Sequence, residues 1–150
     1  MKAEFKKGFD EYVCEGDTIT TEHEGITYTA SLVRDEGYGI DDDDIHNVDQ
    51  SVTGCNDEQQ EKLLFARAKW FAGEWWYCGL SIVASVNGHY LGAGKGFIIP
   101  ATSLWALEAN YPGSDNSYLL EVANEILPEA IEQARKDVAE LLAALLEVSE

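Results

Sequence analysis

The last third of the chain carries the pattern that most restricts how it can fold. Apolar residues recur there at steps of three and four, which is the spacing of one face of an α-helix. The phase of this pattern survives Pro128, so it predicts one long, bent helix rather than two separate helices. One of Asp115, Asn116 or Ser117 would cap its start. The eight apolar positions are Leu120, Ala123, Leu127, Ile131, Ala134, Val138, Leu141 and Leu145.

The central part of the chain has the alternation and turn signals of β-strands. Thr18–Glu24 and Ile26–Arg34 read as a strand pair around a Glu24-Gly25 turn. Trp75–Val86 is apolar on both faces, as in a central strand. Asn87-Gly88 follows it, and this pair favours a type I′ turn because both of its residues tolerate a positive φ. A return strand should therefore start at His89, and residues 97–99 and 102–107 are predicted as further strand pieces.

Two further helices are predicted outside the last third. Residues 2–12 place Phe5, Phe9 and Tyr12 at helical spacing, which predicts a short amphipathic helix. A middle helix should run from Asn56 or Asp57 to about Phe71. Asn56 is a suitable cap for the middle helix, and Gly73 would end it. Together these patterns predict an α+β fold in a single domain over residues 1–150. In it, an antiparallel sheet of four to five strands packs against the middle helix and the long C-terminal helix.

The charge of the chain is unusual for a domain of this size. It has 150 residues, with 28 acidic against 10 basic side chains, which gives a formal net charge of −18. Solubility alone needs a net charge of only roughly 2 to 8. Phosphates attract Lys and Arg, so direct binding to nucleic acid is disfavoured. A cationic partner is therefore expected, although bound cations or a habitat of high salt would also fit the charge.

An acidic loop is predicted at about residues 35–55. It contains the run Asp41, Asp42, Asp43 and Asp44. An EF-hand starting at Asp41 would need Gly at its sixth position and Glu at its twelfth, where this chain has His46 and Val52. We therefore interpret the run as solvent-exposed, so its conversion to Asn should leave folding nearly unchanged.

Other chemical motifs are incomplete. The glycine-rich stretch from Gly88 to Gly96 departs from the P-loop pattern at two positions. The three cysteines Cys14, Cys55 and Cys78 are far apart, which predicts no disulfide framework and a reducing compartment. Pairing of His46 with Cys55, or of His23 with Cys14, lacks the usual spacings of zinc ligands. Cys78 and the tryptophans are expected in the core. No cofactor, metal site or catalytic residue is predicted.

Carboxylates follow the side of the predicted C-terminal helix that lies opposite its apolar stripe. Glu121, Glu125, Glu129 and Glu132 are its first four members. A spacing of four residues corresponds to about 6 Å of helix rise. DNA rises about 3.4 Å per nucleotide on each strand, so such a row can imitate every second phosphate. An ordinary solvated helix face would show the same pattern.

Part of the chain resembles a loose family of short, acidic, uncharacterised phage and prophage proteins. The resemblance covers about residues 74–125. It rests on Glu74-Trp75-Trp76-Tyr77, on Ser103-Leu104-Trp105-Ala106-Leu107-Glu108, and on Ser117-Tyr118-Leu119-Leu120-Glu121-Val122-Ala123-Asn124-Glu125. It implies a phage or mobile-element origin and no defined activity. Short acidic phage proteins are often inhibitors of host defence, including DNA mimics, so an inhibitor is expected by analogy.

The favoured hypothesis is a phage-encoded inhibitor, not an enzyme, that binds a basic nucleic-acid-binding surface of a host protein. Asp41–Asp44 and the carboxylate row would make the contact. The alternative is a phage accessory or assembly protein whose charge serves solubility. No signal peptide or membrane helix is expected, which predicts a cytoplasmic location in the host cell. The apolar end of the last helix predicts a homodimer made through Leu141, Leu142, Leu145 and Leu146.

Overall fold

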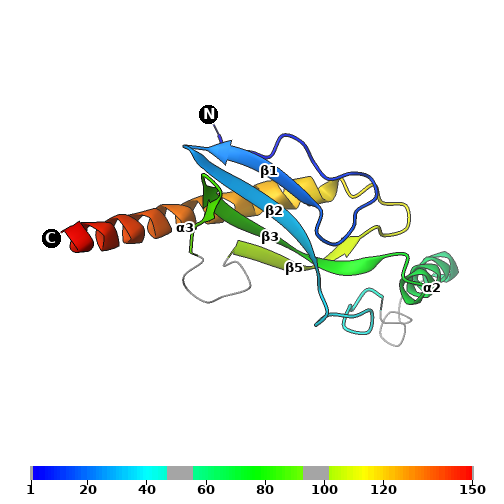
Figure 1. Cartoon of the computed structure of the whole chain (residues 1–150). Coiled ribbons are helices and arrows are strands. Elements are labelled where there is room, and N and C mark those ends of the chain that lie inside the picture. Colours follow the sequence, from blue (N-terminus) through cyan, green and yellow to red (C-terminus); the bar gives the residue numbers. More distant parts are fainter. Residues whose placement is uncertain (1, 47–55, 93–101, 150) are drawn as a thin grey trace.

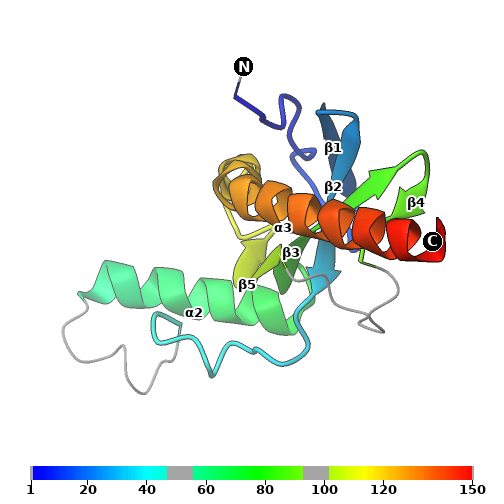
Figure 2. The same ribbon diagram turned by 90° about the vertical axis from the view of Figure 1, so that its left-hand side faces the viewer.

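The computed structural model describes residues 2–46, 56–92 and 102–149, and it confirms the predicted α+β fold. Its antiparallel sheet has the order β1-β2-β3-β4, with β5 paired to β3 as well (Figure 1). The long helix α3 crosses one face of this sheet, and the middle helix α2 lies at one end of it (Figures 1 and 2). The strands are β1 (Thr18–His23), β2 (Ile26–Arg34), β3 (Trp76–Val86), β4 (His89–Tyr90) and β5 (Thr102–Ala109), and the helices are α2 (Asp57–Phe71) and α3 (Tyr118–Ser149).

Both predicted hairpin turns are present. Glu24 and Gly25 have φ values of 53° and 78°, and Asn87 and Gly88 have φ values of 50° and 80°. These positive values suit the twist of the flanking strands, so both turns set the strand register directly. The predicted return strand is only the two residues of β4, because β5 occupies the rest of that edge of β3. The strand piece predicted at residues 97–99 lies outside the described residues.

β3 is buried on both faces, as its composition predicts. Trp76, Cys78 and Leu80 point towards α3 and belong to the main core, whereas Trp75 and Tyr77 belong to a second cluster on the other side of the sheet. Neither of the adjacent tryptophans is exposed, so neither offers an interface. Burial raises the pKa of the Cys78 thiol to about 12, which agrees with its predicted place in the core.

A β-bulge in β5 adapts this strand to β3. Between the pairs Cys78↔Leu107 and Leu80↔Leu104, β5 has one residue more than β3. The ring of Trp105 packs on Gly79, where an added Cβ would lie only 2.3 Å from the ring. Ala106, beside it, has a φ of 60°. A bulge of this kind changes the direction of the side chains that follow it, and here Glu108 follows.

α2 begins and ends as predicted. Asn56 and Gln59 form a reciprocal capping box, and Gly73 follows the helix with a φ of 76°. The indole of Trp75 donates a 2.7 Å hydrogen bond to the carbonyl oxygen of Ala66, which attaches α2 to the end of β3. Among the described residues, no helix combines the length and the apolar composition that crossing a bilayer requires.

The prediction of a helix at residues 2–12 is wrong. This segment is irregular, and its backbone bonds to side chains from distant parts of the chain. The amide group of Asn124 on α3 receives a 2.7 Å bond from the backbone N–H of Phe5 and donates a 3.2 Å bond to the carbonyl of the same residue. Phe5 is buried, whereas Tyr12 is 69% exposed, so these aromatic residues do not share one face. In this segment, hydrogen bonds to distant side chains replace the backbone hydrogen bonds of a helix.

α3 is one continuous helix through Pro128, as predicted. Its buried face contains Leu119, Ala123, Leu127, Ala130 and Ala134, and Leu120 at the start of the predicted stripe is only half-buried. From residue 139 to residue 148 every side chain is exposed, and this end of α3 projects beyond the sheet (Figure 1). The predicted interface residues Leu141, Leu142, Leu145 and Leu146 are 53–68% exposed.

The exposed end of α3 motivates a prediction of oligomeric state. Isolated helices of about 12–15 residues are marginal in water, so a projecting apolar turn gains stability from a partner helix. We expect a homodimer made through this end in solution, since leucines at steps of three and four suit helix pairing. Light scattering at tens of micromolar should give twice the mass of the chain.

Two variants test this interface by placing charge on opposite sides of the exposed end of α3. Leu142→Glu with Leu146→Glu should give a folded monomer, because two carboxylates cannot be buried against a second copy without partners. Ala144→Glu lies on the side of the helix opposite Leu142 and Leu146 and should leave the dimer intact. A wild-type chain that remains monomeric would reject this interface.

Candidate functional site

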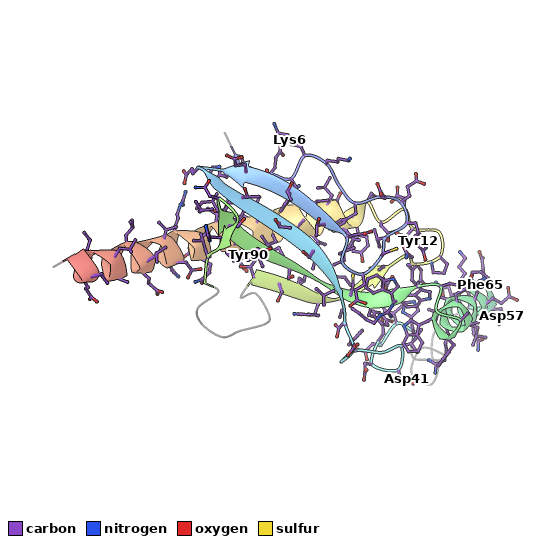
Figure 3. The ribbon with its side chains drawn as sticks, viewed as in Figure 1. Lys6, Tyr12, Asp41, Asp57, Phe65 and Tyr90 are labelled. Carbon is purple, nitrogen blue, oxygen red and sulfur yellow. The ribbon has the colours of Figure 1, made fainter. Side chains whose placement is uncertain are left out.

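The four aspartates of the acidic loop do not share one environment. Asp41, Asp42 and Asp44 are exposed, whereas Asp43 is buried and only 8% exposed. The interpretation of the whole run as solvated is therefore wrong for Asp43. Asp41 forms an ion pair with Arg67 of α2 at 2.6 Å, which holds the loop against that helix. Figure 3 shows Asp41 on this loop.

The carboxylates predicted on α3 do face solvent. Glu121, Glu125, Glu129 and Glu132 are all exposed, on the side of α3 away from its buried residues. Glu132 pairs with Lys136 at 3.5 Å, and the other three make no ion pair within the described part of the chain. The acidic loop lies beside α2, however, and this row lies on α3 (Figures 1 and 2). The two predicted acidic groups are thus on different elements.

A buried polar network lies beneath the acidic loop, at the end of β3. Its centre is the carboxylate of Asp43. The hydroxyl of Tyr77 donates a 2.9 Å bond to Oδ2 of Asp43, and the backbone N–H of Ile45 donates a 2.9 Å bond to Oδ1. Burial alone would raise the pKa of Asp43, but its contacts with His46 and Tyr77 outweigh that cost and hold the pKa below 3.8. Asp43 is thus an internal anion.

His46 continues the network on the other side of Asp43. Its side chain is 3% exposed, and its Nε2 shares a 2.9 Å hydrogen bond with the hydroxyl of Tyr111. Nδ1 lies 3.1 Å from Oδ2 of Asp43, yet no hydrogen bond of acceptable geometry joins these atoms. The rings of Trp75 and Tyr111 pack against the imidazole, with centroids 5.5 Å and 5.4 Å away. The orientation of His46 is therefore fixed on all sides.

Glu108 brings a second carboxylate to the same place. It lies directly opposite Tyr77 in the β3–β5 pairing, two residues beyond the bulge at Ala106. Asp43, His46 and Glu108 each offer one ligand atom, and these atoms lie within 4.8 Å of one another. Burial raises the pKa of Glu108, and the neighbouring charge of Asp43 raises it further, while His46 opposes both effects.

Two clefts reach this network from solvent. One, of about 370 Å³, is lined by Glu108, Tyr111 and Tyr118, and the other, of about 630 Å³, by Tyr111 and residues of α2 that include Phe65. Both clefts therefore border the network at Tyr111, which bonds to His46, and the smaller cleft also borders it at Glu108. The arrangement unites an imidazole and two carboxylates, which can exchange protons or hold a cation.

The comparisons with known proteins do not identify a relative: no protein-family model, no curated protein sequence and no solved structure matches this chain. The chain is an α+β protein with a five-stranded antiparallel sheet.

The sequence does not predict this buried network, because its residues are far apart along the chain. His46 and Tyr111 are 65 residues apart, and Tyr77 and Asp43 are 34 apart. The sequence suggested only pairs with cysteine for the histidines, and Cys55 lies outside the described residues. No ligand group of three or more that involves Cys14 or His23 occurs within the described ranges. The only sequence signal was the presence of one histidine and one acidic run in a single loop.

The burial of Asp43 generates a stability prediction. Asp43→Asn should lower the free energy of unfolding by about 1–3 kcal/mol at neutral pH, because it removes a charged acceptor of internal hydrogen bonds. Asp42→Asn should change it by less than about 0.5 kcal/mol, because an exposed amide oxygen can still accept the bond from Gly39. Chemical denaturation measures both values.

The pH dependence of the free energy of unfolding should distinguish Asp43→Asn from wild type. The folded pKa of Asp43 is lowered, so its ionisation stabilises the fold above about pH 4 and this contribution is lost as the pH falls through the folded value. The difference between wild type and Asp43→Asn should therefore shrink in acid. A constant difference between about pH 7 and pH 3 would show that Asp43 acts through shape and not charge.

Proposed function

We propose that this chain is a phage-encoded acidic inhibitor that binds a basic, nucleic-acid-binding surface of a host defence protein, such as a CRISPR or restriction nuclease. The observation that carries the proposal is the exposed row on α3. Four carboxylates lie on its outer side, and the sequence has no Lys or Arg from residue 96 to residue 134. Glu121, Glu125 and Glu129 form a negative face on a rigid helix, and the Glu132–Lys136 pair ends it. Such a face is an appropriate counterpart for a basic groove.

The dimensions of the row support a phosphate-like role. Glu121, Glu125 and Glu129 are spaced by four residues, so they extend over about 12 Å of helix. The corresponding length of one DNA strand contains three to four phosphates at about 3.4 Å each. The helix is anchored along its inner side by buried residues such as Ala123 and Leu127, so binding need not order its backbone, and only the glutamate side chains lose freedom.

The exposed aspartates of the loop would contribute to association rather than to the contact itself. Asp41, Asp42 and Asp44 add negative potential beside α2, and such charges raise the rate of encounter with a cationic partner. Asp43 is excluded from this role because its carboxylate faces inward. The net charge of −18 acts in the same direction over the whole surface.

The second candidate function is that of a phage accessory or assembly protein. The leucines at the projecting end of α3 favour it, since an exposed apolar patch usually marks an association surface. In that case the carboxylates would serve solubility, and their neutralisation would leave partner binding unchanged. The two functions therefore differ in which variants abolish binding.

The test compares two variants of equal charge. Gln in place of Glu121, Glu125, Glu129 and Glu132 removes the row, whereas Gln in place of four exposed glutamates elsewhere, Glu4, Glu11, Glu22 and Glu36, changes the net charge equally. Capture of host proteins by the first variant should fall about tenfold or more, and the second should retain most of it. Equal losses would mean that only the total charge matters.

Two further measurements address the mimicry of DNA. Double-stranded DNA should release the captured protein, because both ligands would occupy one surface, and raising the salt from about 0.05 M to about 0.5 M should weaken capture. The chain alone should not shift DNA or RNA in an electrophoretic assay. A partner that holds DNA and this chain together would contradict the mimicry.

A further inference from the structure

The cluster of Asp43, His46 and Glu108 has a feature that internal hydrogen bonding does not explain. Nδ1 of His46 is fully buried and has no hydrogen-bond partner among the described residues. Buried polar atoms without partners are rare in folded proteins, and each requires an explanation. This atom faces the carboxylate of Asp43, with 3.1 Å between Nδ1 and Oδ2.

The hydrogen bond between Nε2 of His46 and Tyr111 suggests why Nδ1 has no hydrogen-bond partner. If Nε2 carries the proton and donates to the hydroxyl of Tyr111, then Nδ1 presents a lone pair to a carboxylate oxygen, and the two would repel. A cation between them removes this conflict. Two ligands of one tetrahedral zinc ion, each about 2.0–2.1 Å from the metal, are about 3.4 Å apart, which is close to the observed separation.

The surroundings of the cluster match those of metal ligands. In metal sites, ligating carboxylates accept outer hydrogen bonds, and ligating histidines use their second nitrogen to bond a neighbouring group. Asp43 accepts bonds from Tyr77 and from the backbone of Ile45, and His46 bonds to Tyr111. These contacts hold Asp43 and His46 in place, with a ligand atom of Glu108 within 4.8 Å of theirs.

The local charge also requires compensation. Two carboxylates lie within 4.8 Å in a site that is largely closed to water. The guanidinium of Arg67 lies beside this loop, but it bonds to Asp41 and to the backbone carbonyl of His46. A bound dication would balance both acidic groups, and the 370 Å³ cleft beside Glu108 provides an entry path.

We propose that Asp43, His46 and Glu108 bind one transition-metal dication, with Zn²⁺ the preferred ion. One imidazole and two carboxylates form a donor set that suits Zn²⁺ better than Ca²⁺ or Mg²⁺, which take oxygen ligands. Three protein ligands leave a coordination position for water or a further group. No metal site is predictable from the sequence, because these three ligands come from the acidic loop and from β5. This proposal does not depend on the function proposed above.

The experiment uses the full chain without an affinity tag, treated first with a chelator. Titration with Zn²⁺ in excess Mg²⁺ should give one site by calorimetry, and the melting temperature should rise by about 5–10 °C at a hundredfold excess over Kd. Co²⁺ bound at the same site should show the visible absorption of a low-coordinate ion. Absence of saturable binding in excess Mg²⁺ would overturn the proposal.

The variants separate this site from the acidic surface and from thiols. Glu108→Gln keeps the shape of a half-buried side chain and should weaken Zn²⁺ binding about 100-fold or more, while the metal-free protein melts close to wild type. Glu36→Gln removes one exposed carboxylate and Cys14→Ser an exposed thiol, and both should bind like wild type. If Glu108→Gln binds Zn²⁺ as wild type does, the ion occupies another place and the proposal is wrong.

The nitrogen signals of His46 provide a readout that does not depend on affinity. The ¹⁵N shift of Nδ1 should move on addition of Zn²⁺, while Nε2 keeps its proton and its bond to Tyr111. A proton found on Nδ1 that persists at saturating Zn²⁺ would identify a purely internal His46–Asp43 pair and would refute metal binding.

Discussion

The burial of β3 on both faces is the constraint on which the rest of the structure depends. A strand with apolar side chains on both sides needs a layer over each face. α3 covers the face of Trp76 and Leu80, and the acidic loop with α2 covers Trp75 and Tyr77 at the strand's end. An acidic loop is an unusual cover for aromatic rings, and here the hydroxyls of Tyr77 and Tyr111 bond to Asp43 and His46 respectively.

The elements that could be predicted are those specified by local chemistry. Asn87-Gly88, the capping residue Asn56 and the apolar stripe of α3 each act within a few residues, and each led to the correct element. The N-terminal segment failed because its hydrogen bonds go to Asn124, 119 residues from Phe5. Helical spacing over two turns is weak evidence when tertiary bonds compete for the same backbone groups.

The two candidate sites differ in the same way: one depends on local sequence and the other on contacts between distant residues. The exposure of the α3 carboxylates followed from the helical period, since it required only that the apolar side be buried. The buried cluster did not follow, because the loop, β3 and β5 must first assemble before Asp43, Glu108 and Tyr111 meet. The bulge at Ala106 that directs Glu108 has no signature in the sequence, since its φ of 60° is at an alanine rather than a glycine.

The amide side chains that hold the N-terminal segment affect the order in which the chain can be completed. Asn110 and Asn116 bond to the backbone of Val13 and Glu11, and Asn124 bonds to that of Phe5. All three asparagines lie in the last third of the sequence. During synthesis on the ribosome, these asparagine bonds cannot form until most of the chain has emerged, whereas Thr21 can bond to the carbonyl of Glu4 much earlier. The contacts of Phe5 with Asn124 therefore form late, after the intervening sheet has been made.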